Sequence, residues 1–537
     1  MIITNVNVLN YRNIDGIKVT LHPDCNYIIG KNNIGKSNCL SLLSTICNGY
    51  TFENEDFLNT EKPIEVEIKI KLSPKEYGFF GDNFSPEDSS SINIRYRQAI
   101  QDPYPSIVCV DTNESISRRA IQKINYMQYE TTSIPSRKLR LDTQEGAGLL
   151  INNFISRFLD SNSKPVFLND EQIVRLKDFI NDRLNKIKSF REYSIEAAVA
   201  SDPIELLTSM FYLSDGSRKI ATTASGVQFI AMASINILCQ IMTLYNDKAV
   251  PFKERLYTDD NGKKILSLVL SIDEPEVHLH PYLQRSLIGF YKRILKNKDP
   301  EFVDLLKQCF DIDGIDGQLI IVTHSTDALI GDYRSIIRFY KKEGNVSVIC
   351  GYDTALQLDA NNKKHLIMHF PEIKEVFYAN CAILIEGETE YGCIHNFADK
   401  LGISLDDYGI CVINARGEGA IPSLQRLLDV FKVRTVAIYD KDVETGQTPA
   451  DNEFYTQELC FEVEIVKAFC NGEQADLIKQ IACDLDHKAA SQSMTAEFVR
   501  NSFKKMNIPL DDGYVTKKLS DIDDKKDKEE FIRLYAA

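Results

Sequence analysis

The residues best suited to chemistry lie near the start of the chain, where residues 30–37 read Gly-Lys-Asn-Asn-Ile-Gly-Lys-Ser. An apolar stretch precedes this loop, and a segment that can be helical follows it. A strand, a loop with glycines at its first and sixth positions, Lys-Ser and a helix form the pattern of a phosphate-binding loop. Lys36 would reach the β- and γ-phosphates, and the Ser37 hydroxyl would ligate Mg²⁺. We therefore expect ATP here, contacted by Gly30, Asn32, Asn33, Gly35, Lys36, Ser37 and Asn38.

Arg12 is a further candidate for this nucleotide site. It lies at the first predicted turn, in the stretch Val-Leu-Asn-Tyr-Arg-Asn at residues 8–13. The residue can be interpreted as an ordinary surface arginine or as a cation that reaches a bound phosphate. The sequence leaves both interpretations open.

Three later stretches supply the other parts of an ATPase. Residues 224–228, Ala-Ser-Gly-Val-Gln, come directly before a long apolar helix, and a Ser-Gly pair at a helix N-terminus can bind an anion. An apolar strand ends in Asp273 and Glu274, of which the first would hold Mg²⁺ and the second would polarise the attacking water. Another apolar strand ends in His324, which can sense the γ-phosphate. Each motif is weak alone, but their order together indicates nucleotide hydrolysis.

This order of motifs resembles the ATP-binding-cassette heads of the SMC, Rad50 and RecF type. The resemblance implies that Ser225, Gly226 and Gln228 belong to a signature motif that contacts the γ-phosphate bound by another subunit. Two heads would then sandwich two ATP molecules. Residues 276–281, Glu-Val-His-Leu-His-Pro, would lie at the dimer seam. The two histidines of that loop could instead be a metal pair, but the resemblance favours the interface.

A second group of acidic residues follows predicted strands in the last third of the chain. Glu386 ends an apolar strand, and Glu390 lies one helical turn later on the same side. Asp440 and Asp442 follow another apolar strand, one small α/β unit further on. Because the carboxyl ends of parallel strands share one crevice, we expect these four carboxylates to converge.

Converging carboxylates repel one another unless cations lie among them. Hard oxygen ligands select Mg²⁺ or Mn²⁺, and such ions can activate water and stabilise the leaving oxygen of a phosphodiester. The alternative is a set of solvated acids at strand ends. Because the two acidic motifs occur together, we favour a metal-dependent centre for phosphodiester cleavage.

This half of the chain resembles a Toprim domain, as found in topoisomerases, bacterial primases and some nucleases. In the Toprim pattern, the position of Glu386 is the general acid/base, and those of Asp440 and Asp442 bind metal. A cassette-type ATPase head followed by Toprim is the arrangement of the OLD (overcoming lysogenization defect) family of ATP-dependent nucleases. The resemblance covers nearly the whole chain. It implies two metals and adds Glu390 as a ligand.

The OLD resemblance implies two further site residues. A glutamate after the aspartate pair could be Glu462 or Glu464, and we take Glu462 as the candidate metal ligand. A late catalytic lysine could be Lys517, Lys518, Lys525, Lys526 or Lys528, and nothing in the sequence chooses among them. Family members include effectors of bacterial anti-phage systems, such as the Gabija nuclease subunit and retron-linked nucleases.

The composition limits the kind of protein that positions these residues. The chain has 537 residues, and its net charge of −15 argues against general polyanion binding by bulk charge. Its thirteen cysteines are scattered without a Cys-x-x-Cys pair, as in a reduced cytosolic protein, so we expect neither a disulfide framework nor a zinc site. The chain begins directly with a predicted strand, and its longest apolar run contains polar residues. We therefore expect no signal peptide, no membrane span and a cytoplasmic location.

The pattern of apolar residues predicts an α/β chain with three parts. Residues 1–110 and 215–350 would form a cassette-type (SMC/RecF-like) P-loop ATPase head, interrupted by a mainly helical insertion at 111–214. A Toprim nuclease domain would occupy 370–537. Basic residues flank the start of the insertion and can be a solvated face or a surface for DNA or a partner. They are Arg118, Arg119, Lys123, Arg137, Lys138 and Arg140, with Lys186 and Lys188 later.

Together these features predict a homo-oligomeric ATPase and Mg²⁺-dependent DNA endonuclease whose heads pair around ATP. The resemblance also implies a defence role with a partner such as a helicase, or a reverse transcriptase with its DNA. An alternative is an ATP-switched DNA-binding or scaffold protein with a silent Toprim domain. A primase lacks support because no zinc-binding cysteine pattern is present, and none of the 24 tyrosines is marked as a topoisomerase nucleophile.

Overall fold

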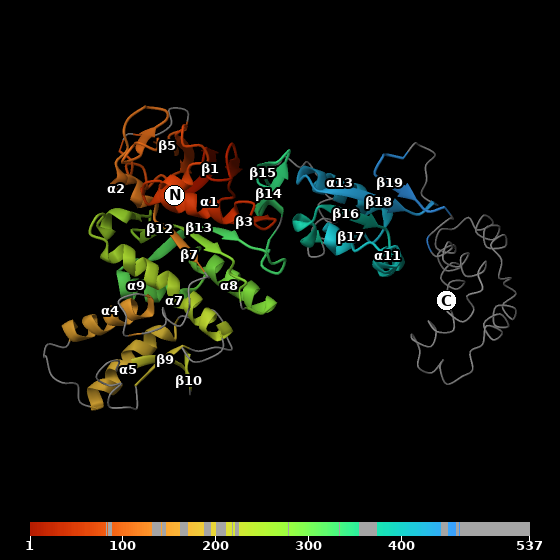
Figure 1. Ribbon diagram of the computed structural model, residues 1–537. Helices are drawn as coiled ribbons and strands as arrows, with labels where there is room; N and C mark the ends of the chain where they lie inside the picture. Colours follow the sequence, from red (N-terminus) through yellow and green to blue (C-terminus); the bar gives the residue numbers. More distant parts are fainter. Residues whose placement is uncertain are drawn as a thin grey trace, which may run out of the picture. The chain divides into compact units, whose positions relative to one another are not determined.

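The structure is a computed structural model. It describes residues 1–81, 83, 88–130, 141, 146–161, 170–186, 195–199, 211–216, 218–220, 225–277, 279–331, 333–353, 373–441, 449–457 and 461. The chain divides into two compact units, Met1–Ala355 and Leu356–Ala537. Figure 1 shows the elements of both units, coloured along the sequence.

The first unit is built on a seven-stranded sheet of order β11-β12-β13-β3-β14-β15, in which β7 also pairs with β12. The strands are β3 (Cys25–Gly30), β7 (Tyr126–Glu130), β11 (Leu256–Thr258), β12 (Lys264–Asp273), β13 (Gly314–Val322), β14 (Ile336–Lys342) and β15 (Asn345–Cys350). Its central pairings are parallel. Strands β3, β12 and β13 are buried along almost their whole length, as in a parallel sheet covered on both faces.

A second, antiparallel sheet has the order β2-β1-β4-β5-β6. Its strands are β1 (Ile2–Leu9), β2 (Lys18–Thr20), β4 (Ile64–Lys71), β5 (Ser91–Gln98) and β6 (Ser106–Cys109). In β4, apolar residues alternate with Glu and Lys, and the apolar ones are buried while the charged ones are not. This alternation is typical of a strand with one buried face.

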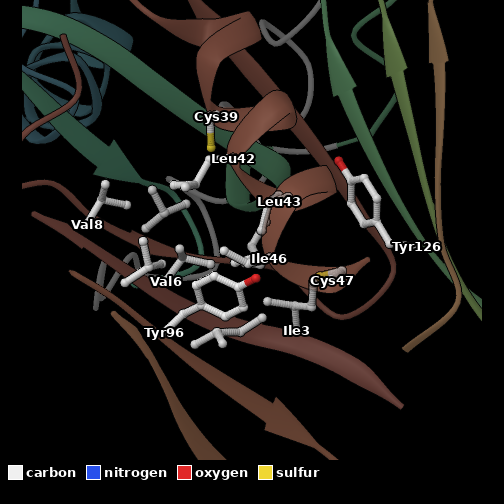
Figure 2. Packing of buried hydrophobic residues seen from close by; sticks show 14 of the residues in the cluster. Ile3, Val6, Val8, Cys39, Leu42, Leu43, Ile46, Cys47, Tyr96 and Tyr126 are labelled. Atoms are coloured by element: carbon white, nitrogen blue, oxygen red, sulfur yellow. The ribbon is translucent and has the colours of Figure 1, made fainter. Parts of the chain in front are cut away.

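Helix α1 (Lys36–Cys47) lies between these two sheets. Its Leu42, Leu43 and Ile46 are buried in one cluster with Val6 of β1 and Tyr96 of β5, as Figure 2 shows. Burial of each such aliphatic side chain contributes about 1.5–3 kcal/mol, so the helix that follows the phosphate-binding loop is firmly anchored.

Residues 111–214 are not only helical. They contain α4 (Gly146–Ser161) and α5 (Asp170–Leu184), but also β7, which pairs with β12 of the main sheet. They also contribute β8 (Glu196–Val199) and β9 (Phe211–Asp215), which form a three-stranded sheet with β10 (Arg218–Lys219). A short strand whose partner lies far away in the sequence leaves no local signal of its pairing, so sequence periodicity alone could not assign β7 to the ATPase sheet.

Three further helices lie in the described part of the first unit. They are α7 (Ser225–Asn246), α8 (Pro281–Ile294) and α9 (Pro300–Phe310). Helix α7 packs on α4, and α4, α5, β9 and β10 lie together at one end of the unit in Figure 1. Helix α9 begins where the Asp299 side chain accepts a hydrogen bond from the Phe302 N–H (3.1 Å), with Pro300 in the first turn. Short turns of helix are α2 (Arg118–Ile121), η1 (Asn54–Asp56), η2 (Gln122–Ile124), η4 (Phe252–Arg255) and η5 (Tyr333–Ser335).

The second unit contains a parallel sheet of order β17-β16-β18-β19. The strands are β16 (Cys381–Ile385), β17 (Ile410–Asn414), β18 (Arg434–Tyr439) and β19 (Glu453–Tyr455). The helical elements are η6 (Glu375–Tyr378), α11 (Glu388–Lys400), α12 (Leu405–Tyr408), η7 (Glu418–Ala420) and α13 (Ile421–Val430). The strand, helix, strand, helix, strand order predicted for residues 381–439 is confirmed. Throughout the described parts of both units, every helix is too short or too polar to span a bilayer.

Candidate functional site

Both glycines of the phosphate-binding loop have a positive φ and are approached too closely to carry a side chain. Gly30 has φ +145°, and a Cβ there would lie 2.4 Å from the Phe339 carbonyl oxygen of the neighbouring strand. Gly35 has φ +105°, and a Cβ there would lie 2.4 Å from a methyl carbon of Ile14. The described structure shows no side-chain hydrogen bond capping α1 at Gly35. The first N–H groups of α1 are therefore open to an anion, as the loop motif predicts.

Lys36 is buried, with 4% of its surface exposed, at the first turn of α1. Its Nζ donates hydrogen bonds to the carbonyl oxygens of Gly30 (2.9 Å) and Lys31 (2.7 Å). Burial lowers the pKa of Lys36 to about 8, while Glu274, Asp273 and Glu276 act in the opposite direction. The ammonium group is thus held over the loop among carboxylates from the strand ends. The adjacent Ser37 is exposed, so its hydroxyl is accessible to an ion.

Arg12 lies beside the first turn of α1. Its Nε donates to Asp56 Oδ1 (2.8 Å), and its Nη1 donates to Asn38 Oδ1 (2.8 Å). Asn38 in turn donates to Asn13 Oδ1 (2.8 Å). The structure therefore places Arg12 and Asn38 together at the edge of the loop. Asn32 and Asn33, the other two expected contacts, are exposed at the loop tip.

Asp273 and Glu274 end β12 at the same sheet edge as the loop after β3. Asp273 pairs with Val322 of β13, which lies between β12 and β3. Glu274 has φ +50°, a left-handed conformation that is costly for a residue with a side chain, and its N–H donates to the Val322 carbonyl (2.8 Å). The chain therefore turns sharply at the candidate catalytic glutamate, in a backbone conformation that is strained.

His324, at the end of β13, faces this glutamate. Its Nε2 lies 3.6 Å from Glu274 Oε1. The pKa of His324 is lowered by burial and by the charge of Lys36, and Glu274 opposes these effects. The imidazole is therefore neutral at neutral pH. The structure brings together Lys36, Asp273, Glu274 and His324, as the order of motifs predicts.

The sequence reasoning did not identify Glu276 as part of this group. Its carboxylate accepts hydrogen bonds from Thr323 Oγ1 (2.8 Å) and from the His324 N–H (2.5 Å). The resemblance implies only that residues 276–281 lie at the dimer seam. A sequence signal for Glu276 does exist, namely a second glutamate close after the Asp-Glu pair. One turn of the chain can bring such a residue to the end of the neighbouring strand.

The expected signature motif forms the start of α7, because that helix begins at Ser225. Ser225 and Gly226 lie in its first turn, and Gln228 follows within it. His280 is the exposed residue before α8, with its ring 5.1 Å from that of Tyr282. His278 lies outside the described residues, so the alternative of a histidine pair is not decided.

The second candidate centre lies at the carboxyl edge of the sheet in the second unit. Glu386 follows β16 and Asp440 follows the adjacent parallel strand β18. Glu386 Oε1 accepts a hydrogen bond from the Asp440 N–H (3.0 Å), and Asp440 Oδ1 accepts one from the Phe461 N–H (3.1 Å). The structure thus brings the Glu386 carboxylate to the backbone of Asp440.

Glu390 turns back toward the same strand end. It is 5% exposed, and its Oε2 lies 3.0 Å from where a Cβ on Gly387 would be. Within the part of the chain that the structure describes, no three His, Cys, Asp or Glu side chains are grouped to hold a metal ion. Asp442, Glu462, Glu464 and the five candidate lysines lie outside the described residues.

The described members of the basic clusters make contacts within the chain. Arg119 and Lys123 both pair with Glu254. Arg118 lies over the Tyr50 ring, 5.6 Å from its centroid. Arg137, Lys138, Arg140 and Lys188 lie outside the described residues.

Two family models match the chain. The AAA ATPase domain model matches residues 1–193 and 249–329, which is about half of the chain and includes the loop, Asp273, Glu274 and His324. The model "Overcoming lysogenization defect protein-like, TOPRIM domain" matches residues 377–442, which include all four predicted carboxylates. The chain belongs to the AAA ATPase domain family, and its second unit contains an OLD-like TOPRIM domain. Its fold is an AAA ATPase domain followed by an OLD-like TOPRIM domain, as the sequence motifs predict.

The chain is also similar to two curated relatives. Endonuclease GajA of Bacillus cereus (strain HuB5-5) is 27% identical over 199 residues, 34% of this chain and 27% of the relative. The OLD nuclease of Thermus scotoductus (strain ATCC 700910 / SA-01) is 25% identical over 197 residues, 36% of this chain and 34% of the relative. The matched part thus spans about a third or less of each relative's length.

Solved structures similar to this chain include an SMC head bound to the C-winged helix domain of ScpA. It has a TM-score of 0.39 and 14% identity, over 65% of this chain and 98% of that one. The recombination mediator RecF has a TM-score of 0.33 and 13% identity, over 64% of this chain and 97% of that one. These values are too low to support an argument about this chain.

Proposed function

We propose that this protein is an ATP-dependent, divalent-metal-dependent DNA endonuclease of the OLD family. The observation that carries the proposal is the presence of two separate strand-end sites. One places Lys36 among Asp273, Glu274 and His324, and the other joins Glu386 to Asp440. The printed names of the two curated relatives, an endonuclease and a nuclease, support the same activity.

In the ATPase domain, the loop N–H groups and Lys36 would bind the phosphates, and Ser37 and Asp273 would hold Mg²⁺. Glu274 would accept a proton from the attacking water, and the His324 imidazole, whose Nε2 lies 3.6 Å from Glu274 Oε1, would lie near the γ-phosphate. Two subunits would pair so that Ser225 and Gly226 at the start of α7 contact ATP on the partner. The N-terminus of a long helix suits an anion in that role.

In the TOPRIM domain, Glu386 and Asp440 offer the hard oxygen donors that Mg²⁺ and Mn²⁺ prefer. Glu390 would have to move in to join them, and Asp442 and Glu462 would complete the set. The ions would activate water and stabilise the departing oxygen of a DNA phosphodiester. Glu386 fits this assignment because the Asp440 backbone N–H already holds its carboxylate at the strand edge. The Phe461 N–H holds one oxygen of the Asp440 carboxylate in turn.

The setting of this activity is a further part of the proposal. None of the described cysteines is in a disulfide, which suits the reducing cytosol. The OLD relatives suggest a role in anti-phage defence, and a partner such as a helicase or a reverse transcriptase with its DNA would provide the trigger.

A plasmid-nicking assay tests the nuclease assignment. Purified protein with ATP and Mg²⁺ or Mn²⁺ should convert supercoiled plasmid to nicked or linear DNA. Glu386→Ala and Asp440→Ala should remove this activity. Glu388→Ala is the matched control, because Glu388 is an exposed acid in the same loop and helix start. Cleavage that survives both site variants contradicts the assignment, and DNA binding without cleavage in either ion supports an ATP-switched scaffold instead.

A further inference from the structure

A carboxylate outside the Asp-Glu pair ties together two loops of the ATPase site. Glu276 lies in the loop after β12, two residues beyond Glu274. It accepts a hydrogen bond from the Thr323 hydroxyl (2.8 Å) and one from the His324 backbone N–H (2.5 Å), both at the end of β13. Thr323 is fully buried, so its hydroxyl has little access to water as an alternative partner.

The same two loops are joined a second time by Gln284 in the first turns of α8. Its Nε2 donates to the Leu279 carbonyl (2.9 Å), and its Oε1 accepts from the Ser325 hydroxyl (2.6 Å). An ion pair between Arg285 and Asp327 follows on the surface. Three successive contacts, from Glu276, Gln284 and Arg285, therefore join these two segments. The contact of Glu276 is the one nearest to the candidate catalytic residues.

This arrangement fixes the position of His324 relative to Glu274. The His324 backbone is held by Glu276, while its Nε2 lies 3.6 Å from Glu274 Oε1. Reacting groups must be held to within a fraction of an ångström, and a misplacement of 1 Å can cost about 10²-fold in rate. A residue that fixes the backbone of His324 thus controls the geometry of the hydrolytic site without touching the nucleotide.

We propose that Glu276 is a positioning residue for ATP hydrolysis. It acts through its side-chain length, which allows its two hydrogen bonds, and not through its charge. The inference rests on the ATPase activity under "Proposed function". Since Glu276 begins the loop that we expect at the dimer seam, it would also transmit the pairing of two heads to His324.

Three substitutions separate the effect of side-chain length at position 276 from the effect of its charge. Glu276→Gln keeps the length of the side chain and both bonds, because its oxygen can accept from the His324 N–H and its amide can donate to the Thr323 hydroxyl. Glu276→Asp keeps the charge but is one methylene shorter, and Glu276→Ala loses both bonds. We expect kcat for ATP to fall less than about threefold in Glu276→Gln but about tenfold or more in the other two, the effect of losing one or two buried hydrogen bonds.

The measurement is steady-state ATP hydrolysis, with the affinity for a fluorescent ATP analogue and the melting temperature recorded beside it. A positioning role lowers kcat while KM and the affinity stay within about twofold of wild type. Glu114→Ala, an exposed glutamate in the loop after β6, is the control for general effects of removing an acid. The Gln and Asp variants remain informative if Glu276→Ala fails to fold.

Two results would overturn the inference. If Glu276→Asp hydrolysed ATP at the wild-type rate while Glu276→Gln lost activity, hydrolysis would require the charge of the side chain and not its length. If all three variants hydrolysed ATP at the wild-type rate, the contacts would have no role in the reaction. Neither result could be confused with failure of the proposed function, because in that case the wild-type protein itself would not hydrolyse ATP.

Discussion

The strand-end site of the ATPase domain and that of the TOPRIM domain balance negative charge in different ways. In the first, Lys36 brings a full positive charge among Asp273, Glu274 and Glu276. In the second, the hydrogen bonds described for Glu386 and Asp440 come from backbone N–H groups, which carry only partial charges. Both sites use the carboxyl edge of a parallel sheet, so the difference lies in the side chains that the loops supply.

This difference bears on how far each site would depend on divalent ions. Lys36 is held in place by two carbonyl oxygens, so the loop is organised before phosphate arrives. Carboxylates that share a strand edge repel one another, and divalent cations relieve that repulsion. We therefore expect the two sites to respond very differently to metal removal.

Chelation of divalent ions should produce the largest difference between the responses of the two sites. With EDTA, DNA cleavage should fall to background, at least about 10³-fold, because the activated water depends on bound ions. Binding of a fluorescent ATP analogue should weaken but persist, since the loop N–H groups and Lys36 remain. Added Mg²⁺ or Mn²⁺ should restore cleavage. Cleavage that continues in EDTA would contradict a metal-dependent TOPRIM site.

Removal of the lysine in the phosphate-binding loop should be nearly as damaging to the ATPase domain. Lys36→Ala should lower ATP hydrolysis about 10²–10³-fold, because the charge on the transferred phosphate loses its main partner. Lys31→Ala, an exposed lysine of the same loop, should retain the wild-type rate. Hydrolysis that survives in Lys36→Ala would show that the chain neutralises this charge elsewhere.

A smaller change can test how closely Glu390 belongs to the TOPRIM site. Gly387→Ala would place a Cβ 3.0 Å from Glu390 Oε2, so the carboxylate must move by a few tenths of an ångström. We expect about tenfold slower cleavage, with little change in melting temperature. Gly392→Ala is the control, because the space beside that helical glycine is open. Equal cleavage by both variants would remove Glu390 from the candidate metal ligands.

Sequence reasoning recovered much of both sites because their motifs are local. The glycines around Lys36 and the acids after apolar strands lie within short stretches, and strand-end geometry then places them at one edge. The same reasoning located Glu386 and Asp440, which share a hydrogen bond in the structure. Asp442 and Glu462 lie outside the described residues and stay predictions.

Contacts between distant segments could not be predicted in this way. The pairing of β7 with β12 depends on a partner far along the chain, and β7 carries no local mark of it. Glu276 binds a loop about fifty residues later, and its sequence neighbours suggested only a dimer seam. Such contacts depend on the order of strands in the sheet, which short sequence patterns do not encode.

The smallest expected effect concerns Arg12, for which the sequence leaves two interpretations. Because its side chain is 38% exposed, the ion pair with Asp56 should contribute about 0.5–1 kcal/mol to the free energy of unfolding. Arg97→Ala, which removes a similarly exposed arginine paired with Glu65, is the matched control for that loss. If Arg12 also contacts the nucleotide, Arg12→Ala should raise KM for ATP about threefold to tenfold, which is one charge-assisted hydrogen bond. An unchanged KM with the same fall in melting temperature as Arg97→Ala would identify Arg12 as a surface residue. The ATPase site would then rely on Lys36 and the loop N–H groups for its positive charge, a sharper contrast with the carboxylates of the TOPRIM domain.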